Sequence, residues 1–217
     1  MTPQLLSRDA DHHLTPWPEY SPPPGLARGD QAVVLAEIMH EPVAVWDRPS
    51  PLDDALVARA CARGLAIKSW VETALLMPTL RRLLPAEDDA ALREDLALLA
   101  DMTACLFGVT GVGLRVTALE KPMCPRFHVD RIPVRLLCTY GGPGSEWLPA
   151  AAVPPGLLTP GARQEGAFPA DAVQRLAAGQ VALFRGDTWD DTPGGGVVHR
   201  SPPVPAGTRR LLVTLDI

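Results

Sequence analysis

Three side chains of metal-ligand type are spaced so that they could bind one metal ion together. His128 and Asp130 lie two residues apart in the segment Pro125–Asp130, and His199 follows far downstream. Residues two apart on an extended strand project to the same face, so the His128 imidazole and the Asp130 carboxylate can occupy adjacent corners of one ion. Two imidazoles and one carboxylate leave the remaining positions open, the arrangement that suits non-haem Fe(II) chemistry with oxygen. The spacing predicts a metal site with vacant coordination positions.

Composition narrows the class of protein around this site. The chain has 217 residues, of which 47% are hydrophobic, so it can build the core of one domain of good size. The net charge is −5 and the basic residues are scattered, so we expect no nucleic-acid partner. No apolar run approaches the length of a membrane span and the first residues lack a signal-peptide pattern, so we expect a cytoplasmic protein with no membrane partner.

The cysteines do not form a metal or redox motif of their own. Cys61, Cys105, Cys124 and Cys138 lack the paired spacing of zinc ribbons and of thioredoxin-like motifs. In a reducing compartment we expect them to be thiols.

The elements that must position the ligands change character near residue 108. Residues 1–30 are rich in proline and predict an extended arm, and residues 31–108 predict a mainly helical support region. Within that region residues 43–46 predict a strand, and apolar spacing predicts helices from Pro51 to Leu65, Ser69 to Leu84 and Asp88 to Phe107. We expect Ser50 to cap the first of these helices and Gly108 to end the last.

Residues 109–217 predict the metal-binding core. Short strands are expected over 112–119, 134–140, 180–184, 196–199 and 209–217, with turns rich in glycine and proline between them. Such punctuation is typical of a barrel or a double-sheet jelly roll. The fold expected is α+β, with a helical N-terminal region packed on a double-stranded β-helix (jelly-roll) core in one integrated domain.

The order of motifs after residue 110 resembles the 2-oxoglutarate/Fe(II) dioxygenase superfamily, most closely its prolyl-hydroxylase-like branch. Members show His-x-Asp, a strand ending near a tyrosine, a Gly-Gly-Glu turn, an apolar strand, a distal histidine and a basic residue about ten positions later. The matching positions here are His128, Asp130, Tyr140, the turn 141–146, the strand 179–184, His199 and Arg209. The stretch between Trp147 and Ala182 matches no strand of the superfamily.

The resemblance implies a hydroxylase that uses Fe(II) and 2-oxoglutarate. His128, Asp130 and His199 would bind the iron, Arg209 would pair with the distal carboxylate of 2-oxoglutarate, and Tyr140 could donate its hydroxyl to the same cosubstrate. A buried dicarboxylate needs a cation at its far end, and arginine offers a planar, permanently charged fork.

Other side chains could meet a small-molecule or peptide substrate, whose identity the sequence does not disclose. Arg135, Arg200 and Trp147 are the candidates: Arg135 faces either substrate or solvent, Arg200 could meet an anionic substrate, and Trp147 either lines the mouth of the site or has a structural role. Spacing favours Arg209 over Arg210 as the partner of the cosubstrate, and on a strand the two would point to opposite faces.

The whole chain also resembles an uncharacterised bacterial domain-of-unknown-function family (1826), which carries the same Cys-Pro-Arg-Phe-His-Val-Asp and Val-His-Arg-Ser-Pro-Pro segments. Genes of that family tend to lie near zinc-homeostasis GTPases. The resemblance keeps open a zinc-binding or zinc-homeostasis protein with a cupin-like fold and no oxygenase activity. Cys124 would then be the fourth ligand of a closed tetrahedral site. A straight strand would hold Cys124 about 13 Å from His128, so this alternative requires the chain to bend back at Pro125.

Two further alternatives remain at this point. One is a cupin-like isomerase or hydrolase that uses three ligands and no 2-oxo acid. The other is an interaction domain in which His128 and His199 are hydrogen-bonded core histidines.

Overall fold

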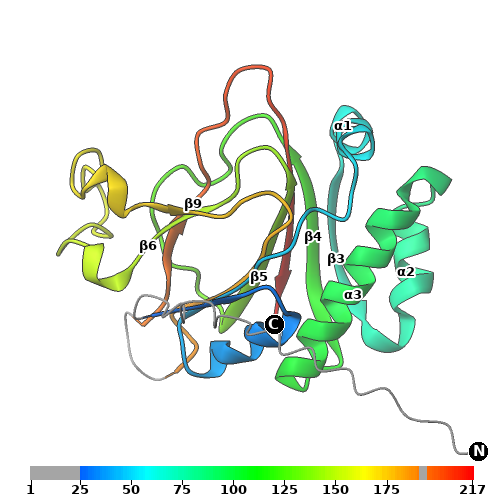
Figure 1. Ribbon diagram of the computed structural model, residues 1–217, viewed down its shortest axis with the longest axis horizontal. Coiled ribbons are helices and arrows are strands. Elements are labelled where there is room, and N and C mark those ends of the chain that lie inside the picture. Colours follow the sequence, from blue (N-terminus) through cyan, green and yellow to red (C-terminus); the bar gives the residue numbers. More distant parts are fainter. Residues whose placement is uncertain (1–24, 191–194) are drawn as a thin grey trace, which may run out of the picture.

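The structure, a computed structural model, describes residues 25–190 and 195–217 (Figure 1). Most of the segment predicted as an arm, residues 1–24, lies outside the described residues. The end of that segment forms strand β1 (Leu26–Gly29), so the main sheet begins before residue 30.

A seven-stranded sheet forms the centre of the molecule. Its neighbours pair antiparallel except β1 and β2, which run parallel. In spatial order the strands are β1, β2 (Val43–Trp46), β8 (Val181–Arg185), β5 (Val134–Gly141), β10 (Arg210–Asp216), β4 (Gly111–Leu119) and β3 (Ala66–Glu72). The region predicted to be mainly helical therefore contributes β2 and β3 to the sheet that also holds the strands of the predicted core.

A three-stranded sheet lies against one face of the large sheet. Its order is β7 (Gln174–Arg175), β6 (Glu146–Leu148) and β9 (Val198–Arg200). Between the sheets lies one apolar cluster, made of Leu26, Val43, Val45, Leu137, Trp147, Leu176, Ala182, Phe184 and Val197. The long connection from β6 to β8 contains β7 and the short 3-10 turns η4 (Ala150–Ala152) and η5 (Ala170–Ala172).

Helices cover the opposite face of the large sheet, where Figure 1 shows α2 and α3 beside β3 and β4. They are η1 (Ala32–Met39), α1 (Asp54–Ala62), η2 (Thr73–Leu75), α2 (Leu76–Leu83), η3 (Glu87–Asp89) and α3 (Ala90–Phe107). Leu92, Leu96 and Leu99 on α3 are fully buried in the apolar cluster that includes this face of the sheet, as their spacing predicts. Gly108 ends α3 with a φ of 64°, also as predicted. The chain is a mixed α/β protein with a large sheet as its core, and no helix among its described residues is long and apolar enough to cross a membrane.

Two local predictions are wrong. The segment from Ser69 does not begin a helix, because Ala66–Glu72 pairs along its whole length with β4 and forms the edge strand β3. The first helix starts later than expected, at Asp54. Its cap is Asp53, whose carboxylate accepts from the Leu56 amide at 2.6 Å.

Candidate metal centre

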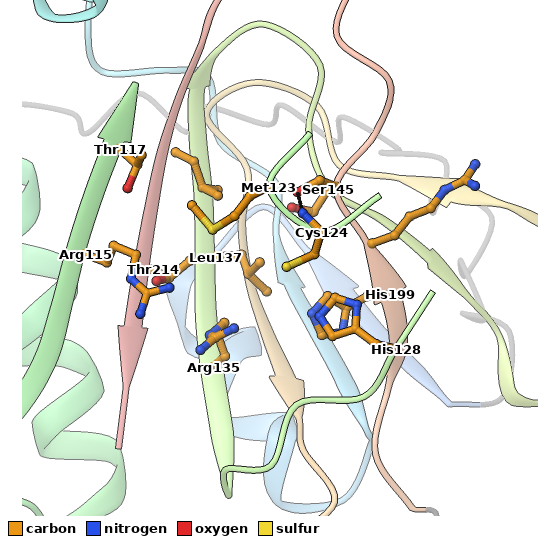
Figure 2. A pocket seen from close by; sticks show the side chains of 13 residues that line it. Arg115, Thr117, Met123, Cys124, His128, Arg135, Leu137, Ser145, His199 and Thr214 are labelled. Atoms are coloured by element: carbon orange, nitrogen blue, oxygen red, sulfur yellow. Dashed lines mark hydrogen bonds between the residues drawn. The ribbon is translucent and has the colours of Figure 1, made fainter. Parts of the chain in front are cut away.

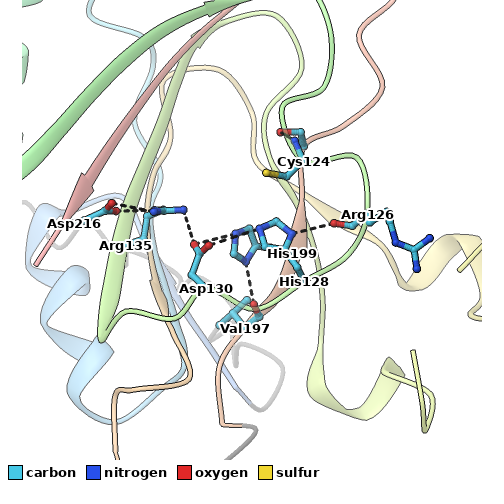
Figure 3. A network of polar contacts seen from close by, with 9 residues as sticks. Cys124, Arg126, His128, Asp130, Arg135, Val197, His199 and Asp216 are labelled. Atoms are coloured by element: carbon cyan, nitrogen blue, oxygen red, sulfur yellow. Dashed lines mark hydrogen bonds and ion pairs between the residues drawn. The ribbon is translucent and has the colours of Figure 1, made fainter. Parts of the chain in front are cut away.

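His128, Asp130 and His199 come together in space, as their residue types predict (Figure 3). One ligand atom from each lies within 4.8 Å of the other two. The His128 Nε2 is 3.6 Å from Asp130 Oδ1, and the His199 Nε2 is 3.3 Å from Asp130 Oδ2. Two nitrogens and one carboxylate therefore converge on one small volume.

The backbone brings the two histidines together. His128 and His199 form an isolated antiparallel bridge, in which each amide donates to the other carbonyl at 3.0 and 2.9 Å. Directly opposed residues of an antiparallel pair project to the same face, so the imidazoles lie side by side with ring centroids 4.6 Å apart. The centroid of the Phe184 ring lies 5.5 Å from that of the His199 ring, so Phe184 packs against the inner side of this imidazole.

Each imidazole is held in the tautomer that metal binding needs. The His128 Nδ1 lies 2.9 Å from the Arg126 carbonyl oxygen, and the His199 Nδ1 lies 3.0 Å from the Val197 carbonyl oxygen. A carbonyl oxygen can only accept, so each Nδ1 carries the proton and donates it. In the neutral rings the Nε2 lone pairs are then available to an ion.

Asp130 is kept ionised by its neighbours. Burial alone would raise the pKa of Asp130, but the neighbouring side chains of His128, His199 and Arg135 bring that pKa well below its ordinary value. The adjacent Asp130 carboxylate in turn raises the pKa of His128.

Arg135 is the orienting partner of this carboxylate. Its Nη1 lies 2.6 Å from Asp130 Oδ2, while its Nε and Nη2 lie 2.6 and 2.9 Å from the two oxygens of Asp216. Arg135 was expected to meet substrate or solvent, whereas its guanidinium is occupied by these two carboxylates. It therefore acts on the site through Asp130.

The backbone that follows Asp130 is anchored to the end of β8. The Gly186 amide donates to Pro133 O at 2.8 Å, and the Asp187 amide donates to Asp130 O at 2.9 Å. A Cβ atom at Gly186 would overlap the Ile132 carbonyl oxygen and lie 2.7 Å from Asp130 O. Only glycine allows β8 to approach the ligand loop this closely.

The two histidines open into a hollow of about 40 Å³ on the inner face of the large sheet (Figure 2). Arg115 of β4, Leu212 and Thr214 of β10 and Ser145 share its lining with the histidines. Arg115 and Thr214 were not expected to take part.

Cys124 lines the same hollow but does not join the ligand group. The chain does bend back after this residue, since the Ser201 amide donates to Cys124 O at 2.8 Å. Figure 3 shows its sulfur on the side of the imidazoles. Among the described residues, however, the atoms within 4.8 Å of one another come from His128, Asp130 and His199 alone. The arrangement supplies three ligands, not the four of a closed zinc site.

Arg209 does not reach the hollow. Its Nη2 lies 2.7 Å from Glu120 Oε1, and its Nη1 donates to Cys61 O at 3.2 Å. The preference for Arg209 over Arg210 therefore needs correction. Arg210, with 0% exposure, precedes Leu212 and Thr214 by two and four residues and shares their face of β10.

Arg210 lacks acceptors for most of its guanidinium. Its Nε donates to Pro143 O at 2.5 Å, but its Nη1 and Nη2 are buried with no hydrogen-bond partner within the described part of the chain. The turn after β5 makes room for its stem, because a Cβ at Gly142, where φ is 78°, would lie 2.9 Å from the Arg210 Cγ. Burial lowers the pKa of Arg210 to about 10, which still leaves the group charged at neutral pH.

Tyr140 faces the helices instead of the hollow. It alternates with Leu137 and Thr139 along β5, and its hydroxyl donates to the Asp95 carboxylate of α3. Arg48 binds the same carboxylate at 2.5 and 2.7 Å. Tyr140 therefore belongs to a buried ion-pair network that ties α3 to the sheet, and the expectation that it binds a cosubstrate is wrong.

Arg200 lines the hollow, but its guanidinium, like the ring of Trp147, is engaged with neighbouring side chains. The Arg200 Nε donates to the buried Glu146 carboxylate at 2.7 Å, and its guanidinium lies 4.4 Å from the Phe127 ring centre. Trp147 is 3% exposed and packs against Phe184 between the sheets. Both support the walls of the site.

Comparison with known proteins gives a family and a set of structural likenesses. The family described as Protein of unknown function (DUF1826) matches residues 29–216. No curated protein matches the sequence. A prolyl-4-hydroxylase from Pseudomonas putida aligns at 15% identity over 85% of this chain and 90% of its own, with a TM-score of 0.43. The viral collagen prolyl hydroxylase of Paramecium Bursaria Chlorella virus-1, in a 2OG complex, aligns at 10% identity over 82% and 96%, with a TM-score of 0.40. Likenesses of this size leave the chemistry to be judged from the geometry of the site.

Proposed function

The chain belongs to the family described as Protein of unknown function (DUF1826), and for this member we propose a hydroxylase that depends on Fe(II) and 2-oxoglutarate and is built on a jelly-roll core. The observation that carries the proposal is the group of His128, Asp130 and His199, two imidazoles held as Nδ1–H tautomers and one ionised carboxylate. The two facing sheets with largely antiparallel neighbours are consistent with a double-stranded β-helix.

The donor set fits a metal that must keep open positions. Fe(II) held by His128, Asp130 and His199 would supply the activation of oxygen, with room left for a bidentate 2-oxo acid. The net reaction would convert 2-oxoglutarate and oxygen to succinate and CO2, while one oxygen atom enters a C–H bond of the substrate.

Arg210 is the candidate partner of the distal carboxylate of 2-oxoglutarate. A buried cation without an acceptor is costly, and a carboxylate would offer two oxygens to its two unpartnered Nη groups. Arg210 thus takes the place that spacing assigned to Arg209. The pairing would neutralise both charges in the interior.

The remaining residues of the site hold the ligands and exclude water. Arg135 keeps Asp130 ionised and oriented, and the carbonyls of Arg126 and Val197 hold the imidazole protons at Nδ1. Phe184 closes the inner side of His199 with an apolar ring.

Anaerobic reconstitution tests the proposal. Protein without an affinity tag, loaded with Fe(II) and then given 2-oxoglutarate, should develop a weak visible charge-transfer band. Arg210→Gln should bind Fe(II) normally but require a much higher 2-oxoglutarate concentration for the band, whereas the matched exposed variant Arg82→Gln on α2 should behave as the wild type. If no band forms and the protein binds one zinc tightly, with Cys124→Ala abolishing that binding, the zinc-binding alternative replaces the oxygenase.

A further inference from the structure

We propose that Arg115 and Thr214 form a second anion-binding site beside the metal hollow, and that it receives an oxyanion group of the substrate, a carboxylate, phosphate or sulfate. The inference rests on the proposed function for the identity of its ligand as substrate. The anion site itself stands on residues outside the metal ligands and outside the candidate cosubstrate cation.

Arg115 is a cation that lines the hollow and has no ion-pair partner among the described residues. Val112, Leu114 and Val116 of β4 are buried toward the helices, so the alternation of the strand turns Arg115 toward the metal side. Figure 2 shows its guanidinium beside Thr214 and Arg135. It is half-buried, and no carboxylate or other acceptor binds it across residues 25–190 and 195–217. A partly desolvated guanidinium in this state favours an anion.

Thr214 provides a second, independent observation that supports an anion-binding site. It is the register partner of Arg115 across the β10–β4 pair, so the two side chains are neighbours on one face. Thr214 is 5% exposed, it lines the hollow, and its Oγ1 has no hydrogen-bond partner among the described residues. Buried hydroxyls are rarely left unpaired, so an oxyanion that accepts from Thr214 and Arg115 together would satisfy both.

A groove leads from the edge of the sheet to Arg115. A second hollow, of about 320 Å³, lies over β3 and β4 and shares Arg115 with the metal hollow. Lys68 adds a second cation, while the two oxygens of Asp216, which also borders the groove, are taken by Arg135. Basic groups therefore dominate the groove where a ligand would lie.

Trp70 gives this groove an exposed aromatic wall. Trp70 is 58% exposed and its ring lies over Gly111 of β4, since a Cβ at Gly111 would come within 2.9 Å of the indole. An exposed indole next to two cations suits a ligand that combines a planar or apolar part with an anionic group. The substrate class inferred is such an anionic small molecule, held at Arg115 with its reacting carbon toward the metal ligands.

Arg115 and Arg210, neither of which has a carboxylate partner among the described residues, suit two different anions. Arg210 is fully enclosed, as fits a cosubstrate bound before the site closes, whereas Arg115 borders the open groove, as fits a substrate that enters and leaves. The division of tasks can be tested because each arginine can be removed separately.

The test measures binding, without turnover. Full-length protein is loaded with Mn(II), saturated with 2-oxoglutarate and titrated calorimetrically with sodium sulfate at constant ionic strength. Wild type should bind one sulfate. Arg115→Gln should weaken that affinity about tenfold or more and Thr214→Val about threefold, while Arg82→Gln should leave it unchanged. Arg115→Gln should keep its affinity for 2-oxoglutarate, and Arg210→Gln should lose 2-oxoglutarate but keep sulfate.

Two results would overturn the inference. One is the absence of saturable sulfate binding to the wild type. The other is a loss of 2-oxoglutarate affinity in Arg115→Gln with sulfate binding retained, which would make Arg115 the cosubstrate cation. If Mn(II) and 2-oxoglutarate themselves fail to bind, the proposed function falls. The anion site is then judged by sulfate titration of metal-free Arg210→Gln protein with and without Arg115→Gln.

Discussion

His128 and His199 are backbone partners as well as candidate ligands of one ion, each donating its amide to the carbonyl of the other at 3.0 and 2.9 Å. The candidate metal site is therefore held together by main-chain hydrogen bonds between its two histidines. Removing an imidazole should leave the frame of the site standing.

Replacing either histidine should abolish metal binding without unfolding the protein. His128→Ala and His199→Ala each delete one nitrogen ligand but keep the backbone bridge, so metal content should fall at least about tenfold. Elemental analysis measures the metal content of each variant, and thermal denaturation shows whether it remains folded. His40→Ala, at an exposed position outside the site, should keep its metal, and full metal retention in both site variants would refute the assignment.

Arg135→Gln should weaken metal binding through Asp130. Loss of an orienting partner of a ligand typically costs about 10- to 100-fold in metal affinity. Competition with a chelator measures the affinity. Arg135→Lys, which retains a charge near both carboxylates, should recover part of it, and an affinity for metal equal to that of the wild type in Arg135→Gln would show that Asp130 needs no such partner.

Arg210→Met should stabilise the ligand-free protein while removing its response to 2-oxoglutarate. Among the described residues of the wild type, two buried guanidinium nitrogens have no hydrogen-bond partner, and each such group costs about 1–3 kcal/mol. The variant should therefore melt higher than the wild type when both are free of ligand. Adding Mn(II) and 2-oxoglutarate should raise the melting temperature of the wild type only; a lower melting temperature of the free variant would contradict this account.

Asp95→Asn should destabilise the fold without touching the metal hollow. Asp95 neutralises Arg48 and accepts from Tyr140 in the interior between α3 and the sheet. Breaking a buried pair in this way costs about 3–5 kcal/mol, because the arginine loses its counter-charge. Denaturant unfolding measures the loss, and Asp101→Asn, exposed on the same helix, should change stability by less than about 0.5 kcal/mol.

The thiols should divide into two classes of reactivity. Burial raises the pKa of Cys138 to about 12, so below that pH this side chain stays a protonated thiol, and burial also raises the pKa of Cys61. Cys105 and Cys124 are exposed. An alkylating reagent applied to the native protein at neutral pH should label the exposed pair and leave Cys138 unlabelled, as peptide mass analysis would show; rapid native labelling of Cys138 would contradict its burial.

The ligand set could be predicted from the sequence because the His-x-Asp spacing and the residue types are local signals. The sequence could not show whether Arg209 or Arg210 points into the hollow as the candidate partner of 2-oxoglutarate. β10 is buried on both faces, so Leu211, Leu212 and Val213 form a continuous apolar run with no alternation to tell which of Arg209 and Arg210 points inward.

Arg115 was missed for a different reason. The alternation along β4 was readable, with Val112 and Val116 buried and Arg115 on the polar face. A polar face usually means solvent, and nothing local reveals that Arg115 comes to line the same hollow as His199 of β9, far along the chain. β3 was missed for a similar reason. Its strand conformation is stabilised by pairing with β4, although the apolar spacing around Ser69 favours a helix.

Gly186 packs closely against the carbonyls of Ile132 and Asp130, so a substitution at this position, which provides no ligand, would disturb the candidate metal centre. A side chain there would push the whole loop outward, and the carboxylate would be carried away from the two imidazoles. A sequence that retains His128, Asp130 and His199 but has any other residue at position 186 would still contain the ligand motif. It would nevertheless be unable to bind the metal ion.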